Sequence, residues 1–168
     1  MFSNEIQISY TVDNKDDKEL PFGFGVHPFF QKNSTPLTVC VYAKAVMEMS
    51  EENYPTEKLK LVEGTSFDLR KAVAVEDLNL DHVYINLNDH PQAVIKYPEL
   101  KISLDASDDF SHLVIYTPQG QNFFCLENQT CSTDAHNLYA RGFQKESGLL
   151  ILSPKMQQSG EIRYKFEK

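Results

Sequence analysis

The chain has little of what marks a membrane protein or a nucleic-acid-binding protein. Its apolar runs are short, and none approaches the ~20 residues that a membrane-spanning helix requires. Only 16 of its 168 residues are Lys or Arg, the net charge is −8, and the basic residues form no stripe along the sequence. We therefore expect neither a membrane nor a nucleic acid as a partner.

Cysteine is also scarce. The three cysteines, Cys40, Cys125 and Cys131, are an odd number and include no CxxC pair, so a disulfide framework is not expected. The first residues, Met1–Glu5, show neither the basic nor the apolar region of a signal peptide. Both observations favour a reducing, cytoplasmic location.

Familiar catalytic and cofactor motifs are missing as well. No histidine or cysteine spacing typical of a metal site occurs, and no GxSxG is present. Gly23-x-Gly25 lacks the helix that follows a phosphate-binding loop. We expect no metal and no organic cofactor.

The dominant pattern is the alternation of apolar and polar residues that is typical of strands. Helical periodicity is nearly absent, Pro, Gly, Asn and Asp recur about every ten residues, and the length suits one domain, residues 1–168. We expect an all-β sandwich or barrel, with a short helix at Asp134–Tyr139 capped by Thr133 or Asp134 and a loop or hairpin rim at Glu51–Glu63. The predicted strands are Ile6–Val12, Leu37–Tyr42, Ala45–Met49, Val83–Leu87, Ala93–Tyr97, Leu100–Leu104, Leu113–Tyr116, Phe123–Leu126, Leu149–Leu152 and Glu161–Phe166.

The segment Pro21–Phe30 is the most unusual part of the sequence. Four phenylalanines, two glycines and two prolines surround one ionisable residue, His27. The glycines allow a close backbone approach or a positive φ, and Pro28 forces the residue before it into an extended conformation. An aromatic wall with one imidazole suits a sugar-binding cleft, where the imidazole could act as acid or base near neutral pH. A buried structural histidine would leave the same pattern.

Two acidic residues are further candidates. Glu127 ends an apolar strand, where it is either solvated or held in a cleft whose low polarity would raise its pKa. Asp81 and His82 point to opposite faces if the chain is extended there, so one could face a ligand; a simple turn before a strand is the alternative. We assign no role to His90 or His112, and we expect His136, which follows a capping Asp134, on the surface.

Four motifs in this order resemble the aldose 1-epimerase (galactose mutarotase) family, most closely its bacterial, LacX-like branch. The motifs are Pro21–Phe30, Asp81–Leu87, Tyr116-Thr117-Pro118 leading into Cys125–Thr130, and Thr133–Asn137. Together they cover about the whole chain, and the first and third of them are fairly specific.

The resemblance implies a large antiparallel β-sandwich that interconverts the α and β anomers of an aldohexose such as galactose or glucose, without metal or cofactor. Glu127 matches the general base that takes the anomeric hydroxyl proton, and His27 matches the general acid that protonates the ring oxygen. Asp81 matches an acidic residue that bonds sugar hydroxyls, and Phe29 and Gln129 complete the expected substrate-binding set.

Family members are considerably longer, and the resemblance covers only their C-terminal part. The N-terminal part carries an arginine and a histidine that help to hold the sugar, and Arg70, Arg141 and Arg163 stand in no matching context. Three hypotheses follow: an active enzyme whose truncated sandwich is covered by a homodimer, a non-catalytic carbohydrate-binding remnant, or a structural β-domain without sugar affinity.

Overall fold

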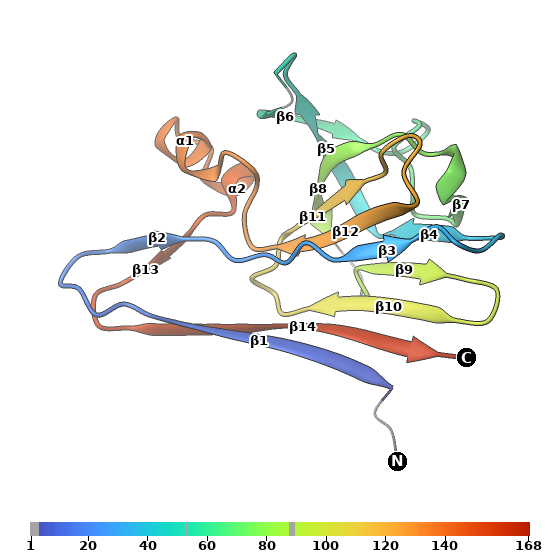
Figure 1. The fold of residues 1–168 in the computed structure, drawn as a ribbon. Helices are drawn as coiled ribbons and strands as arrows, with labels where there is room; N and C mark the ends of the chain where they lie inside the picture. The colour runs from blue at the N-terminus through green and yellow to red at the C-terminus, as the bar shows by residue number, and fades with distance from the viewer. Residues whose placement is uncertain (1–3, 53, 88–89) are drawn as a thin grey trace.

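Two six-stranded antiparallel sheets form the body of the protein (Figure 1). The computed structural model describes residues 4–52, 54–87 and 90–168, so most of Met1–Glu5 and residue 53 of Glu51–Glu63 lie outside the described residues. The first sheet runs in the order β1 (Glu5–Asp13), β14 (Gln157–Glu167), β10 (Lys101–Ala106), β9 (Ala93–Lys96), β4 (Thr38–Val41) and β7 (Val73–Ala74). The second runs in the order β3 (Phe29–Gln31), β12 (Phe123–Gln129), β11 (His112–Tyr116), β8 (Asp81–Leu87), β5 (Ala43–Met49) and β6 (Pro55–Leu61).

Smaller elements complete the chain. A two-stranded ribbon pairs β2 (Leu20–Phe22) with β13 (Leu150–Leu152). The helices are a 3-10 turn, η1 (Val75–Asp77), and two short α-helices, α1 (Ala135–Ala140) and α2 (Gln144–Ser147). None of the helices described has the length and apolar character needed to cross a membrane.

The core lies between the two sheets and is built by the predicted alternation. Every second residue of a strand points inward, so each sheet contributes one apolar face to a common layer. The first sheet supplies residues such as Val39, Ile95, Leu104 and Ile162, and the second supplies Leu113, Ile115, Phe124 and Leu126. The predicted antiparallel β-sandwich is therefore confirmed.

The outer face of the second sheet is only partly covered. A second apolar cluster there joins Met47, Val83 and Val114 to Leu138 of α1, with Phe143 packed against it. The helices thus cover the middle of this face. The outer residues of β12 and β3 lie beyond that cluster, and they carry the candidate site.

The structure corrects several local predictions. Glu51–Glu63, expected as a loop or hairpin rim, does belong to a hairpin, but it contains a strand that was not predicted, β6, which pairs with β5. Asp134 does occupy the N-cap of α1, but its carboxylate accepts a hydrogen bond from the side chain of Asn137 at 2.5 Å and none from the helix backbone. The strands β2 and β3 and the helix α2 were not predicted.

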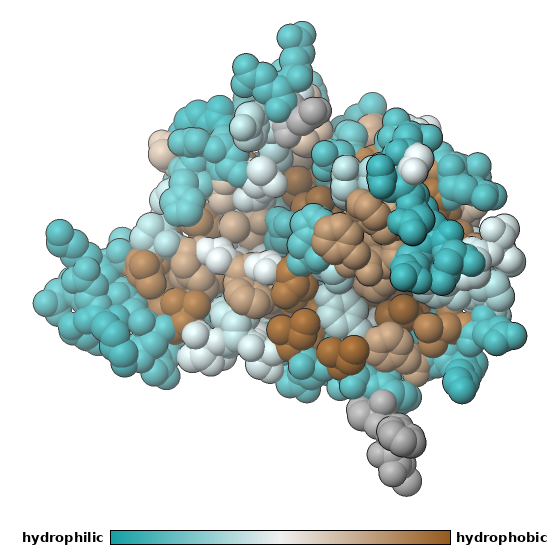
Figure 2. Space-filling view, viewed as in Figure 1, coloured by the Kyte–Doolittle hydropathy of each residue, from teal (hydrophilic) through white to brown (hydrophobic). Residues whose placement is uncertain are grey.

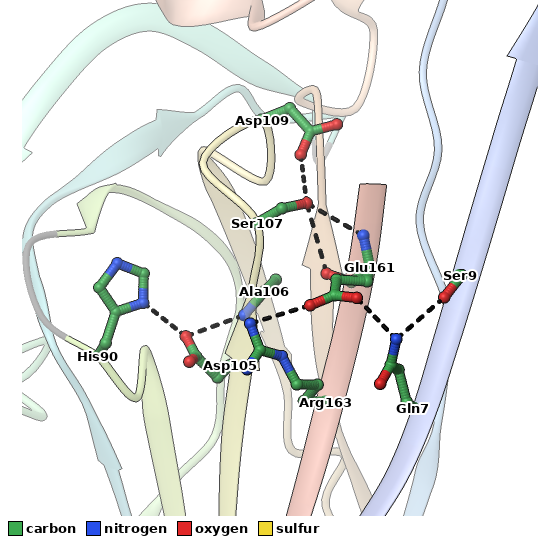
Figure 3. A network of polar contacts seen from close by, with 9 residues as sticks. All are labelled: Gln7, Ser9, His90, Asp105, Ala106, Ser107, Asp109, Glu161 and Arg163. Carbon is green, nitrogen blue, oxygen red and sulfur yellow. Dashed lines mark hydrogen bonds and ion pairs between the residues drawn. The ribbon is translucent and has the colours of Figure 1, made fainter. Parts of the chain in front are cut away.

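A polar network covers the outer surface of the first sheet (Figure 3). The Gln7 amide donates to the Glu161 carboxylate at 2.7 Å, and Arg163 pairs with the same side chain at 2.9 Å. His90, for which we expected no role, pairs with Asp105 at 2.6 Å. Each ion pair joins a partly exposed carboxylate to an exposed cationic side chain, so the ion pairs stabilise the fold only slightly.

His112, expected in a polar or strand-edge setting, is fully buried in β11. Its Nε2 donates to the Glu146 carbonyl at 3.0 Å, and the Ser111 hydroxyl lies 2.9 Å from Nδ1. Gly148, which ends α2 with a φ of +60°, packs so closely that a Cβ there would lie 2.5 Å from the imidazole ring. Burial, which disfavours the charged ring, lowers the pKa of His112 to about 4.

This buried histidine predicts a loss of stability in acid. Since its folded pKa lies below its unfolded value, the unfolded chain binds the proton first as the pH falls. The stabilisation that comes from keeping His112 neutral is complete above pH ~6.5. It is lost as the pH falls to ~4, which lowers the free energy of unfolding by about 3 kcal/mol. Urea unfolding at pH 7 and pH 4 measures it, with His112→Gln as the variant that lacks this titration. An imidazole that titrates near pH 6.5 by NMR in the folded protein would contradict the prediction.

Candidate active site

The unusual segment lies alongside β12 in a single register. A bridge joins Gly25 to Gln129 at one end, and a ladder pair joins Phe29 to Cys125 at the other. The two stretches between these pairs are of equal length. The residue in the middle of one therefore stands opposite the residue in the middle of the other.

Those two middle residues are His27 and Glu127. The Nε2 atom of His27 lies 3.0 Å from Oε1 of Glu127. The histidine side chain is 52% exposed, whereas the glutamate side chain is only 7% exposed. The structure thus places one half-exposed imidazole against one buried carboxylate, although 100 positions separate them in the sequence.

Gly23 and Gly25 are needed here for close approach. Neither is among the glycines with a positive φ. A Cβ on Gly25 would lie 2.9 Å from Cγ of Gln129, and one on Gly23 would collide with Sγ of Cys131. Larger residues at these two positions would push the segment off β12.

Of the four phenylalanines, Phe29 is the one whose ring stacks on His27. Phe22, Phe24 and Phe30 pack against the core between the sheets. Phe29 points outward, is 63% exposed, and stacks on the ring of His27 with centroids 4.8 Å apart. It therefore supplies an apolar surface and also fixes the plane of the imidazole.

The pKa of Glu127 is raised, mainly by burial, which disfavours the charged carboxylate. The nearby charge of Asp81 raises it as well, while a protonated His27 lowers it. Gln129 donates from Nε2 to the second carboxylate oxygen at 3.0 Å, which also lowers the pKa. Each oxygen of this buried group thus has a polar partner.

Asp81 lies on the same face of the sheet. It is the first residue of β8 and stands opposite Tyr116, which in turn stands opposite Cys125 of β12. The neighbouring His82 points the other way and packs on Phe67, with ring centroids 4.7 Å apart. The prediction that Asp81 and His82 face opposite sides is confirmed, and Asp81 is the exposed one.

A cavity of about 440 Å³ opens beside the pair, a size typical of small-molecule sites. Its walls include three residues that were not predicted for a site, Cys131, Ser132 and His136. His136 is exposed, as expected, although it also lies on the cavity wall. No Lys or Arg is among the described residues that line it. The full lining is Gly23, Phe24, Gly25, Val26, His27, Glu127, Gln129, Cys131, Ser132 and His136.

The three arginines are occupied elsewhere. Arg70 pairs with Asp68, Arg163 pairs with Glu161, and Arg141 donates to the carbonyl of Asn137. None of them reaches the carboxylate–imidazole pair through these contacts.

The family model of the aldose 1-epimerases matches residues 2–165. The chain belongs to the aldose 1-epimerase family. No curated protein sequence matches it.

Solved structures share the fold. A candidate aldose 1-epimerase from Escherichia coli K12 superposes with a TM-score of 0.80 at 20% identity, over 98% of this chain and 56% of its own length. A galactose mutarotase-like protein from Clostridium acetobutylicum gives 0.79 at 19% identity, over 96% and 52%. Galactose 1-epimerase from Lactobacillus acidophilus gives 0.76 at 21% identity, over 98% and 54%. The chain thus spans little more than half the length of the proteins it resembles.

Two neighbours of Glu127 are expected to move its pKa in opposite directions. Gln129→Leu removes a donor to the carboxylate and raises the pKa further, whereas Asp81→Asn removes a nearby negative charge and lowers it. Titration of the carboxyl carbon of Glu127 by NMR measures both shifts. Shifts of the same sign in the two folded variants would mean that these side chains do not act on Glu127 as described.

Proposed function

We propose that the protein interconverts the α and β anomers of an aldohexose, such as galactose or glucose. The observation that carries the proposal is the contact between a buried Glu127 carboxylate of raised pKa and a half-exposed His27 imidazole at the wall of a cavity. A carboxylate with a raised pKa is a stronger base, and the imidazole can deliver a proton near neutral pH.

The reaction needs one proton removed and one delivered. Glu127 takes the proton from the anomeric hydroxyl while protonated His27 gives its proton to the ring oxygen. The bond between C1 and the ring oxygen breaks and leaves an open-chain aldehyde. Rotation about the C1–C2 bond turns the other face of the carbonyl toward the hydroxyl, and the reverse proton transfers close the ring as the other anomer.

Three further side chains are suited to hold the sugar. Phe29 offers a flat apolar surface for the C–H face of the ring, next to the imidazole. Gln129 donates to the Glu127 carboxylate, which keeps it oriented, and is one of the residues that line the cavity. Asp81, exposed on the same face of the sheet, can accept hydrogen bonds from sugar hydroxyls.

The proposal predicts that the protein accelerates the mutarotation of fresh α-galactose or α-glucose. Glu127→Gln removes the base and His27→Asn removes the acid, and each change is expected to lower the rate by roughly 10²–10⁴-fold. Polarimetry measures the rate. Glu48→Gln and His90→Asn, at exposed positions away from the cavity, are the matched controls and should retain activity. Wild-type activity that persists in both site variants would falsify the assignment.

A non-catalytic carbohydrate-binding protein is the second candidate. It is favoured by the absence of Lys and Arg from the described cavity lining. Positioning of the substrate contributes ~7–11 kcal/mol to catalysis in favourable cases, so an incomplete set of sugar contacts could leave binding without turnover. Saturable binding of galactose without any acceleration of mutarotation would identify this function.

An apolar groove runs beside the site, between β3 and the pair β1–β14. Figure 2 shows hydrophobic side chains gathered over this region. Two hollows of about 350 and 540 Å³ meet there at Phe30, and His27 lines the first of them. β1 and β3 are the outermost strands of their sheets, and Ile6 is 53% exposed. Such edges and apolar surfaces are normally covered.

We assign this groove to a second copy of the chain, because covering it would also enclose the exposed side of His27. Light scattering is then expected to find a dimer at micromolar concentration. Ile6→Lys should yield a monomer, whereas Leu61→Lys, at an even more exposed leucine on the edge strand β6 of the other sheet, should leave the dimer intact. A wild-type protein that is a stable monomer would rule out this arrangement.

The free state of the cysteines agrees with the proposed reducing, cytoplasmic location. All three are free, and Cys125 is fully buried. Burial raises the pKa of each thiol, which keeps it in the less reactive protonated form.

A further inference from the structure

Three donor atoms of different kinds converge at the site. The imidazole nitrogen of His27, a carboxylate oxygen of Glu127 and the sulfur of Cys125 all lie within 4.8 Å of one another. Cys125 precedes Glu127 by two residues on β12, so both side chains leave the same face of the strand. In the part of the chain that the structure describes, no other group of His, Cys, Asp and Glu side chains is gathered in this way.

The donor set is selective in its chemistry. A thiolate and an imidazole with one carboxylate suit Zn²⁺ or Cd²⁺, whereas Mg²⁺ and Ca²⁺ prefer oxygen ligands only. In a tetrahedral zinc site, metal–ligand bonds of ~2.0–2.3 Å hold the ligand atoms roughly 3.3–3.7 Å apart. Small side-chain movements meet this requirement, and the half-exposed His27 can make the largest of them by sliding along the stacked ring of Phe29. The open cavity leaves the fourth position to water.

We propose that His27, Cys125 and Glu127 form an inhibitory site for a single thiophilic divalent cation such as Zn²⁺. The cation occupies the imidazole nitrogen and the carboxylate that the epimerisation needs, so the bound form cannot transfer protons to or from a sugar. The inhibitory consequence rests on the proposed function, whereas cation binding itself does not.

Binding must displace a proton from the thiol. A bound cation deprotonates a coordinating thiol, and one proton is released for each cation bound there.

Calorimetric titration of the full chain with zinc chloride, after removal of adventitious metal with a chelator, tests the site. One Zn²⁺ should bind per chain. Cys125→Ala should weaken the affinity at least tenfold, whereas Cys131→Ala, which removes a thiol from the wall of the same cavity, should not. Absence of stoichiometric binding, or equal affinity in wild type and Cys125→Ala, overturns the proposal.

Mutarotation measured in parallel separates the two proposals. Saturating Zn²⁺ should reduce the wild-type rate at least tenfold and a chelator should restore it, while Cys125→Ala should keep its own zinc-free rate. If the zinc-free wild type is inactive but binds Zn²⁺ through Cys125, the metal site stands and the proposed function fails. If the zinc-free enzyme is active and saturating Zn²⁺ leaves its rate unchanged, the inhibitory site is wrong.

Discussion

The candidate site depends on one register, that between the segment Gly25–Phe29 and β12. Because side chains alternate between the two faces of a strand, a slip of one residue would turn His27 into the core and separate it from Glu127. The bridge at Gly25 and the ladder pair at Phe29 hold this register on either side of Pro28, which has no N–H to contribute. Small residues at 23 and 25 are the condition for that close approach.

The same register makes a buried carboxylate tolerable. A glutamate with 7% of its side chain exposed is costly unless it is paired, and Glu127 has His27 on one oxygen and Gln129 on the other. The residual cost appears as a raised pKa, which strengthens the base. With Cys125 beside it, the same arrangement forms the proposed site for a thiophilic cation, so the proposed proton transfer and the proposed sensitivity to metal have one structural origin.

Much of the fold could be predicted from the sequence, because most core strands alternate cleanly and lie between turn residues. His27, Glu127 and Asp81 were predicted as site residues from sequence motifs, and the structure brings the first two into contact. The strands β2 and β3 were missed because they are three residues long and lie among prolines and glycines. β6 was missed because an edge strand can remain charged. The burial of His112 was not predicted because it depends on a hydrogen bond to the carbonyl of a residue 34 positions away. Strand alternation places Cys125 beside Glu127, but only after Glu127 has been located on a strand.

His27 and Glu127 are proposed to act as one acid–base unit. Groups that act in the same step lose their effect together, so their substitutions are strongly non-additive. The most direct measurement is the rate of anomer exchange of galactose, by NMR at equilibrium, for wild type, Glu127→Gln, His27→Asn and the double variant. The double variant is expected to be about as slow as the slower single variant. Losses that multiply in the double variant would show instead that the two residues contribute independently, and the acid–base unit would be wrong.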